Sequence, residues 1–272
     1  MALLGSRQIV PAVILMLLAS SSLAWSDELE QLDLVELRDA YTFDLQVARG
    51  LLEEDCRYGK IRGQAVSQKQ LDNYLKVFLP EIKLYPPKLV EKAKVRRIVL
   101  CCDLHFAGQK RSAIPSWENE TMYYDVVSWA TTSYKQLVIH HELFHMIDVH
   151  DDGRIYQDDA WARLLPDSFQ YGTGGRNAQG DRTMSHLTDK VAGFLSKYAT
   201  TGIEEDKAET FAHMLLHPRY LDQRAETEAL LAAKMFYMRR LLKQFCDDMD
   251  NDFWTHVKSI PRPDDTKLRS PS

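Results

Sequence analysis

Apolar residues between positions 26 and 94 recur at helical spacing. The first of them are Leu29, Leu32, Leu34 and Leu37. A second run has apolar residues at positions 71, 74, 75 and 78, with Ser67 before it as a helix cap and Pro80 as its end. Pro86 and Pro87 can open a third, short helix. We therefore expect this part of the chain to be helical.

Two segments in the middle of the chain have the composition of β-strands. Residues 96–106 (RRIVLCCDLHF) are apolar and β-branched and end before Gly108, and residues 122–129 (MYYDVVSW) are the next best candidate. A long helix is predicted from about Tyr134 to Val149, ending at Asp151-Asp152-Gly153. Strands followed by helices favour an α+β fold over alternating βαβ units.

Further helices are predicted towards the C-terminus, and a glycine-rich loop lies between the first two. The helices cover residues 157–165, 188–198, 203–216 and 221–246, and the loop covers residues 171–175. The chain has no repeat and no Gly/Ser linker after residue 25. We expect one domain over residues 25–272, with an N-terminal lobe at 25–150 and a helical C-terminal lobe at 151–272.

The N-terminus has the pattern of a secretory signal peptide. Arg7 precedes an apolar run at residues 9–19, and Ser22 and Ala24 are the small residues that a signal peptidase requires. We predict cleavage after Ala24, removing residues 1–24, with a retained membrane anchor as the alternative. The mature protein is then expected outside the cell or in a periplasm, without stable membrane association.

Charge and cysteine content restrict the partners and the covalent cross-links that we expect. The 34 basic and 39 acidic residues give a formal charge of −5, which argues against a nucleic-acid or anionic-membrane partner. An oxidising compartment makes one or two disulfides plausible, with Cys101 and Cys102 on opposite faces of a strand and bonded to distant partners. The other cysteines are Cys56 and Cys246, and the pairing stays open. Asn119 begins a glycosylation sequon.

The long helix contains the HExxH sequence His141-Glu142-Leu143-Phe144-His145. Four-residue spacing stacks both imidazoles on one face, so that two ring nitrogens can converge on one ion. Glu142 lies beside that face and can accept a proton from a metal-bound water. The helix is apolar at most other positions, which predicts burial and a need for polar partners. One zinc ion per chain is the expected cofactor.

A third ligand is expected from a later helix, because the glycine and histidine that extend HExxH in one zincin class are absent here. Glu205 and Glu209 lie one turn apart within an apolar stretch. We predict that Glu205 binds the metal and that Glu209 orients a zinc histidine. Glu204 is the rival ligand, although Ala208 stands one turn after it.

Other polar residues have weaker assignments. Tyr198, seven residues before Glu205, can reach the site and donate a hydrogen bond to an oxyanion, or can be a core tyrosine. Asp148 is either a partner of His145 or a surface acid. Three further histidines are not expected to bind the ion: His140 on another helix face, and His213 and His217 at a helix end.

These residues together resemble a known family. The HExxH motif with Asp148, then Tyr198, then Glu205 with Ala208, Glu209 and Phe211, is similar to the catalytic domain of anthrax toxin lethal factor and its relatives among zinc metallopeptidases. The resemblance covers roughly residues 134–217. It implies a zincin-like fold, with a small mixed sheet and an active-site helix. It also implies zinc ligands His141, His145 and Glu205, and Glu142 as the general base.

The family's toxin activity is not implied, because the chain has its own signal peptide and no room for the toxin's receptor-binding and docking domains. We expect a secreted zinc endopeptidase acting on a peptide or protein. The substrate would lie extended along the strand at residues 122–127 and add to the edge of the sheet there, with residues 172–175 as a mobile rim. The alternatives are a non-catalytic secreted zinc-binding protein on the same scaffold, and a metal-dependent hydrolase of a non-peptide bond.

Overall fold

A computed structural model of the chain describes residues 37, 39–127, 131–174 and 184–262. The predicted signal peptide, residues 1–24, lies outside the described residues, as do Leu29, Leu32 and Leu34. No helix within the described ranges is long and apolar enough to cross a membrane.

The described strands form one mixed sheet. They are β1 (Asp44–Val47), β2 (Leu52–Cys56), β3 (Gly59–Gln64), β4 (Arg97–Phe106), β5 (Gln109–Lys110), β6 (Ala113–Ser116) and β7 (Thr121–Asp125). Along the sheet the order is β2-β3-β4-β7-β6, and β1 and β5 also pair with β4. The first half of β4 runs parallel to β1 and β7, whereas its second half pairs antiparallel with β3 and β5. The predicted strand at residues 96–106 is therefore the centre of the sheet.

The helical prediction for residues 26–94 is wrong between Asp44 and Gln64, where the chain forms β1 to β3. Exposure alternates along these strands with a period of two, as expected for a sheet with one covered face. Charged residues such as Glu53 and Asp55 fill the exposed positions and leave few apolar residues to mark the strands. β1 and β3 pair with β4, which lies far away in sequence, and β2 joins the sheet only through β3, so the local pattern carries little of the information.

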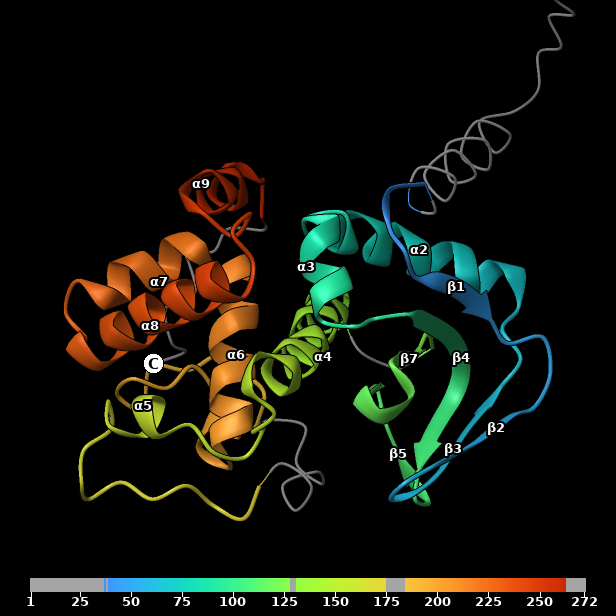
Figure 1. Ribbon diagram of the computed structural model, residues 1–272, viewed down its shortest axis with the longest axis horizontal. Coiled ribbons are helices and arrows are strands. Elements are labelled where there is room, and N and C mark those ends of the chain that lie inside the picture. Colours follow the sequence, from blue (N-terminus) through green and yellow to red (C-terminus); the bar gives the residue numbers. More distant parts are fainter. Residues whose placement is uncertain (1–36, 38, 128–130, 175–183, 263–272) are drawn as a thin grey trace, which may run out of the picture.

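The helices surround a long central one. They are α2 (Gln68–Ile82), α3 (Pro87–Lys92), α4 (Thr132–Asp152), α5 (Asp159–Ala162), α6 (Ile203–Leu216), α7 (Pro218–Ala225), α8 (Ala229–Phe245) and α9 (Asn251–Ser259). Figure 1 shows α4 between the sheet and the C-terminal helices, and α4 contacts α2, α6 and β6. One apolar core extends from α2 through α4 to α9. The fold is α+β, as predicted.

Several predicted helix boundaries are confirmed and others are wrong. Helix α2 begins after Ser67 as expected but continues past Pro80 to Ile82, and α6 has the predicted bounds. The helix predicted at 188–198 is absent, because Gly193 adopts a left-handed φ of 76° within a turn and only a 3₁₀ turn follows at Tyr198–Thr200. The helix predicted at 221–246 is divided into α7 and α8, the one at 157–165 is reduced to α5, and α9 was not predicted.

The predicted disulfides are wrong, since all four cysteines are free. Cys101 and Cys102 do face opposite sides of β4: Cys101 lies in a small cluster with Ile61 and Tyr123, and Cys102 belongs to the main core. The thiol of Cys56 donates to its own hairpin, at the carbonyl of Gly59. Burial raises the pKa of the Cys101 thiol to about 12, so that it remains protonated and unreactive.

Candidate metal centre

Helix α4 carries the HExxH motif into the core. The helix is capped at its start by the Thr131 side chain, which accepts from the backbone N–H of Tyr134, and it stops at Gly153, which has a left-handed φ of 81°. His141 and His145 are both buried, at 7% exposure each. The predicted burial of this helix on most sides is confirmed.

Helix α6 brings the predicted third ligand against the motif. Its N-cap is Gly202, and every residue from Ile203 to Leu216 is buried. α6 packs along α4, and Glu205 and Glu209 lie one turn apart and both contact His141. Polar side chains from two helices distant in sequence therefore meet inside the core.

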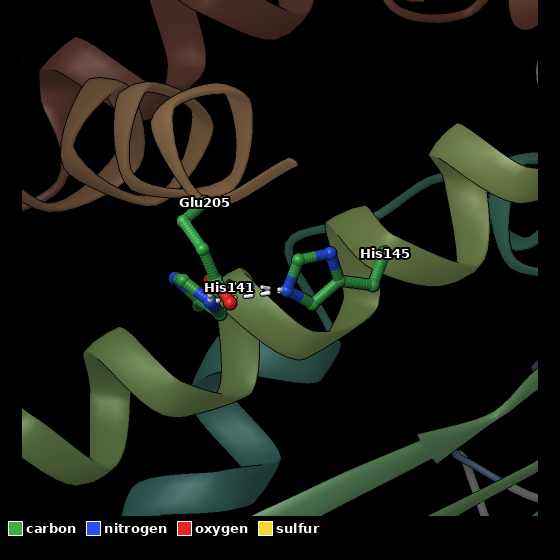
Figure 2. A group of neighbouring side chains, drawn as sticks. All are labelled: His141, His145 and Glu205. Atoms are coloured by element: carbon green, nitrogen blue, oxygen red, sulfur yellow. Dashed lines mark hydrogen bonds and ion pairs between the residues drawn. The ribbon is translucent and has the colours of Figure 1, made fainter. Parts of the chain in front are cut away.

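His141, His145 and Glu205 converge on one point (Figure 2). Their ligand atoms form a triangle: His141 Nε2 is 2.9 Å from Glu205 Oε2 and 3.1 Å from His145 Nε2, and His145 Nε2 is 3.6 Å from Glu205 Oε2. A tetrahedral zinc site with bonds of about 2.05 Å has ligand-to-ligand edges of about 3.3 Å. The triangle therefore has the size of one face of such a tetrahedron, and two imidazole nitrogens with a carboxylate oxygen are a donor set that zinc prefers.

Two further predicted residues support this triangle. Glu209 Oε1 lies 3.0 Å from His141 Nδ1, which sets the ring so that Nε2 faces the triangle. The hydroxyl of Tyr198 donates to Glu205 Oε1 at 2.9 Å, and its ring lies 5.9 Å from that of His141. The five residues thus form one connected hydrogen-bonded group.

The electrostatics of the group favour a cation. Burial by itself raises the pKa of the two carboxyls, but the hydrogen bonds from His141 outweigh it, so that the pKa of Glu209 is lowered to about 2 and that of Glu205 falls well below its ordinary value. Burial also opposes a charge on His141, yet the same two carboxylates raise the pKa of His141 well above its ordinary value. A positive charge is therefore stabilised where the three ligand atoms meet.

Glu142 has the environment of a proton acceptor with raised basicity. Burial raises its pKa above the ordinary value of 4.5, more than the neighbouring charges of His141 and His145 lower it. Arg111, which comes shortly before β6, also lowers this pKa and so lies near the carboxylate. No local pattern marked Arg111 as part of the surroundings of the motif, because it is brought there by the fold.

Asp148 is buried at 1% exposure, which excludes the surface alternative. Its Oδ1 accepts from the ammonium of Lys207, a residue of α6 that the sequence interpretation did not single out. Burial raises the pKa of Asp148 to about 6, against the opposing effect of Lys207. Lys207 follows the three acids Glu204, Glu205 and Asp206, so the local sequence resembles an exposed, charged first turn and carried no signal for a partner on α4.

The remaining predicted residues lie beside the group. The rival ligand Glu204 is not part of the triangle, and its carboxylate lies over Gly202. His140 bonds to Glu81 of α2 and to Tyr85. His213 Nε2 lies 3.7 Å from Glu209 Oε2, and the rings of His213 and His217 stack at the end of α6, 5.2 Å apart.

The prediction that residues 122–127 form the edge of the sheet is wrong. β7 lies between β4 and β6, so β6 is the last strand on this side. In the glycine-rich loop, the N–H groups of Gly172 and Gly174 donate to the carbonyls of Thr200 and Thr201, just before α6. Residue 175 lies outside the described ranges.

Comparison of the chain with protein-family models, with curated proteins and with solved structures finds no match.

Proposed function

We propose that this protein is a zinc-dependent endopeptidase with a zincin-like fold, of the type that the lethal factor family represents. The observation that carries the proposal is the triangle of ligand atoms from His141, His145 and Glu205, with Glu142 of the same HExxH motif beside it. Within the described residues no fourth histidine, cysteine or acid joins this group. Three protein ligands are typical of catalytic zinc sites, whereas structural sites usually have four.

Bound zinc would supply a Lewis acid and a water molecule with a pKa lowered towards about 7. Glu142 would accept the proton of that water and return it to the leaving amine. Its raised pKa suits this task, because a base works best when its pKa lies near the working pH. Tyr198, whose hydroxyl already points at Glu205, would donate a hydrogen bond to the oxyanion of the attacked carbonyl.

An extended peptide is the substrate that the sheet geometry favours. β6 is the last strand of the sheet on the side of α4. The N–H of Asp125 in β7 donates to the carbonyl of Ser112, directly before β6. In an antiparallel pair the backbone groups alternate in direction, so those of Ala113 and Pro115 point away from β7. Proline is tolerated at this position because its missing N–H would face outward. A peptide could add to this edge and pass the HExxH motif.

Secretion is proposed from the sequence of residues 1–24 alone, and with it a substrate outside the cell or in a periplasm. The net charge of −5 favours protein over nucleic acid as the partner.

The test compares the wild type with Glu142→Gln and Glu205→Ala. Zinc per chain is measured by elemental mass spectrometry, and cleavage is measured on casein and on a peptide library. We expect about one zinc in the wild type and in Glu142→Gln, with cleavage by the wild type only, and zinc loss in Glu205→Ala. A Glu205→Ala protein that keeps its zinc would disprove the ligand assignment. Zinc without cleavage in the wild type would favour the alternative of a non-catalytic zinc-binding protein.

A further inference from the structure

The two histidines of the triangle differ in the hydrogen-bond partner of their second ring nitrogen. His141 has Glu209 against its second ring nitrogen, 3.0 Å away. His145 is buried to the same extent, yet its Nδ1 has no hydrogen-bond partner in the described part of the chain. A histidine that binds a metal almost always donates its other N–H to an acceptor, which fixes the tautomer. His145 therefore requires an acceptor close to Nδ1.

Asp148 is the acceptor that the helix offers. It lies three residues after His145, on the same side of α4 and within reach of its side chain. The two oxygens of its carboxylate differ: Oδ1 accepts from Lys207, whereas Oδ2 is buried and has no hydrogen-bond partner among the described residues. A buried donor and a buried acceptor, one helical turn apart, are thus both left to be satisfied.

Lys207 holds this carboxylate from the neighbouring helix. Its ammonium contacts Asp148 Oδ1 and lies 3.0 Å from Asp158 Oδ2, and the residue is only 3% exposed. Lys207 stands two residues after Glu205 on α6, so one short segment carries both a proposed ligand and the cation that holds Asp148. The ion pair therefore also joins the two helices that bear the ligands.

We propose that Lys207 is a positioning residue, which holds Asp148 so that its free oxygen accepts the Nδ1–H of His145 and turns Nε2 towards the metal. This inference rests on the proposed zinc site. Without the ammonium, the Asp148 carboxylate loses its charged partner on α6, and the orientation of His145 is no longer fixed. Loss of such an outer partner typically weakens metal binding by about 10- to 100-fold.

The chain contains a matched control for the loss of a buried lysine. Lys234 of α8 is fully buried and pairs with Asp206 of α6 at 2.7 Å. The other hydrogen bonds of these two side chains are with Trp161, Tyr171 and the carbonyl of Gly193, and not with the ligand atoms of the triangle. Lys207→Met and Lys234→Met therefore remove comparable ion pairs from α6. Only the first of the two pairs leads to a proposed zinc ligand.

The experiment measures zinc affinity by chelator competition on the folded full-length chain. Wild type, Lys207→Met, Lys234→Met and Asp148→Asn are compared, and circular dichroism confirms folding. We expect about 10- to 100-fold weaker zinc binding for Lys207→Met and Asp148→Asn, and less than a threefold change for Lys234→Met. Equal affinity of Lys207→Met and wild type, or an equal loss in Lys234→Met, would overturn the inference.

A double variant covers the case in which Lys207→Met fails to fold. Lys207→Met with Asp148→Asn removes both buried charges together, and so leaves neither of them without its partner. If Lys207 acts through Asp148, the double variant binds zinc as weakly as Asp148→Asn alone. A further tenfold loss would show an independent role and contradict the proposal. A wild type that binds no zinc would instead refute the proposed function.

Discussion

Replacing Arg262 by alanine is expected to destabilise the protein strongly, although this residue lies near the C-terminus. Its guanidinium makes two hydrogen bonds to the carboxylate of Glu81, at 2.6 and 2.7 Å. Glu81 is 2% exposed and also accepts from Gln136 and His140 of α4. Because burial lowers the pKa of His140 and keeps it neutral, Arg262 is the fully charged partner of this buried anion.

The magnitude follows from this geometry. Breaking a buried ion pair by removing one partner costs about 3–5 kcal/mol, because the other charge is left uncompensated. We expect the lower end, about 3 kcal/mol, because Gln136 and His140 still donate to the carboxylate once the guanidinium is gone. The measurement is the free energy of unfolding in urea at pH 7. Lys258→Ala is the control: its pair with Asp222 is 40% exposed on both sides, and the expected change is below about 1 kcal/mol.

The pH dependence gives a second check. Burial raises the pKa of Glu81, but hydrogen bonds from His140 and Arg262 outweigh it and hold the pKa below 4.5. This carboxylate therefore stabilises the wild type above pH 4.5, and the contribution is lost as the pH falls through the lowered pKa. Without Arg262 burial dominates and raises the pKa, so acid destabilises the variant less. The difference between the two proteins should shrink from pH 7 towards pH 4; a difference that grows, or one below about 1 kcal/mol at pH 7, would refute the reasoning.

Three further substitutions test the site and its scaffold. Tyr198→Phe should keep zinc content and lower kcat by about 10²- to 10³-fold, as measured on the peptide that the wild type cleaves; unchanged kcat would exclude the oxyanion role. Glu209→Gln should weaken zinc binding by about 10- to 100-fold in chelator competition. Gly193→Ala should lower the free energy of unfolding in urea by about 1–3 kcal/mol, because the residue has a positive φ and a Cβ would collide with Leu230. The control is Gly50→Ala, where a Cβ would meet open space and the free energy of unfolding should not change.

The parts of the fold that the sequence predicted correctly are those determined by local spacing. Helix α6 has its predicted bounds, and His141 and His145 share one face of α4 because they stand four residues apart. The strands β1 and β3 were missed because they pair with distant β4, and β2 joins the sheet only through β3. The disulfide prediction was wrong for a related reason, since the distances between cysteines depend on the whole fold.

The residues of the candidate site also divide into those that local spacing predicted and those that only distant contacts identify. Spacing alone suggested Glu205 and Glu209, and the structure brings both to His141. Lys207 and Lys234 were not predicted as partners of buried acids, because in both pairs the acid lies on another helix. Lys207 of α6 pairs with Asp148 of α4, and Lys234 of α8 pairs with Asp206 of α6. A polar residue in an apolar helix predicts that a partner exists, but only the packing of helices identifies it.

Charge balance distinguishes the acids of α6 that build the fold from those that would hold a metal. Asp206 has a buried lysine, Lys234, as its ionic partner, and that pair is neutral without any ion. The contacts of Glu205 and Glu209 are instead with histidines and Tyr198. Two ionised carboxylates carry a charge of −2 in a region of low dielectric, where an uncompensated charge is costly, and a proton on His141, whose pKa they raise, offsets only part of it. A divalent cation bound at the triangle would balance this charge, and the same packing that buries α6 would then favour its binding.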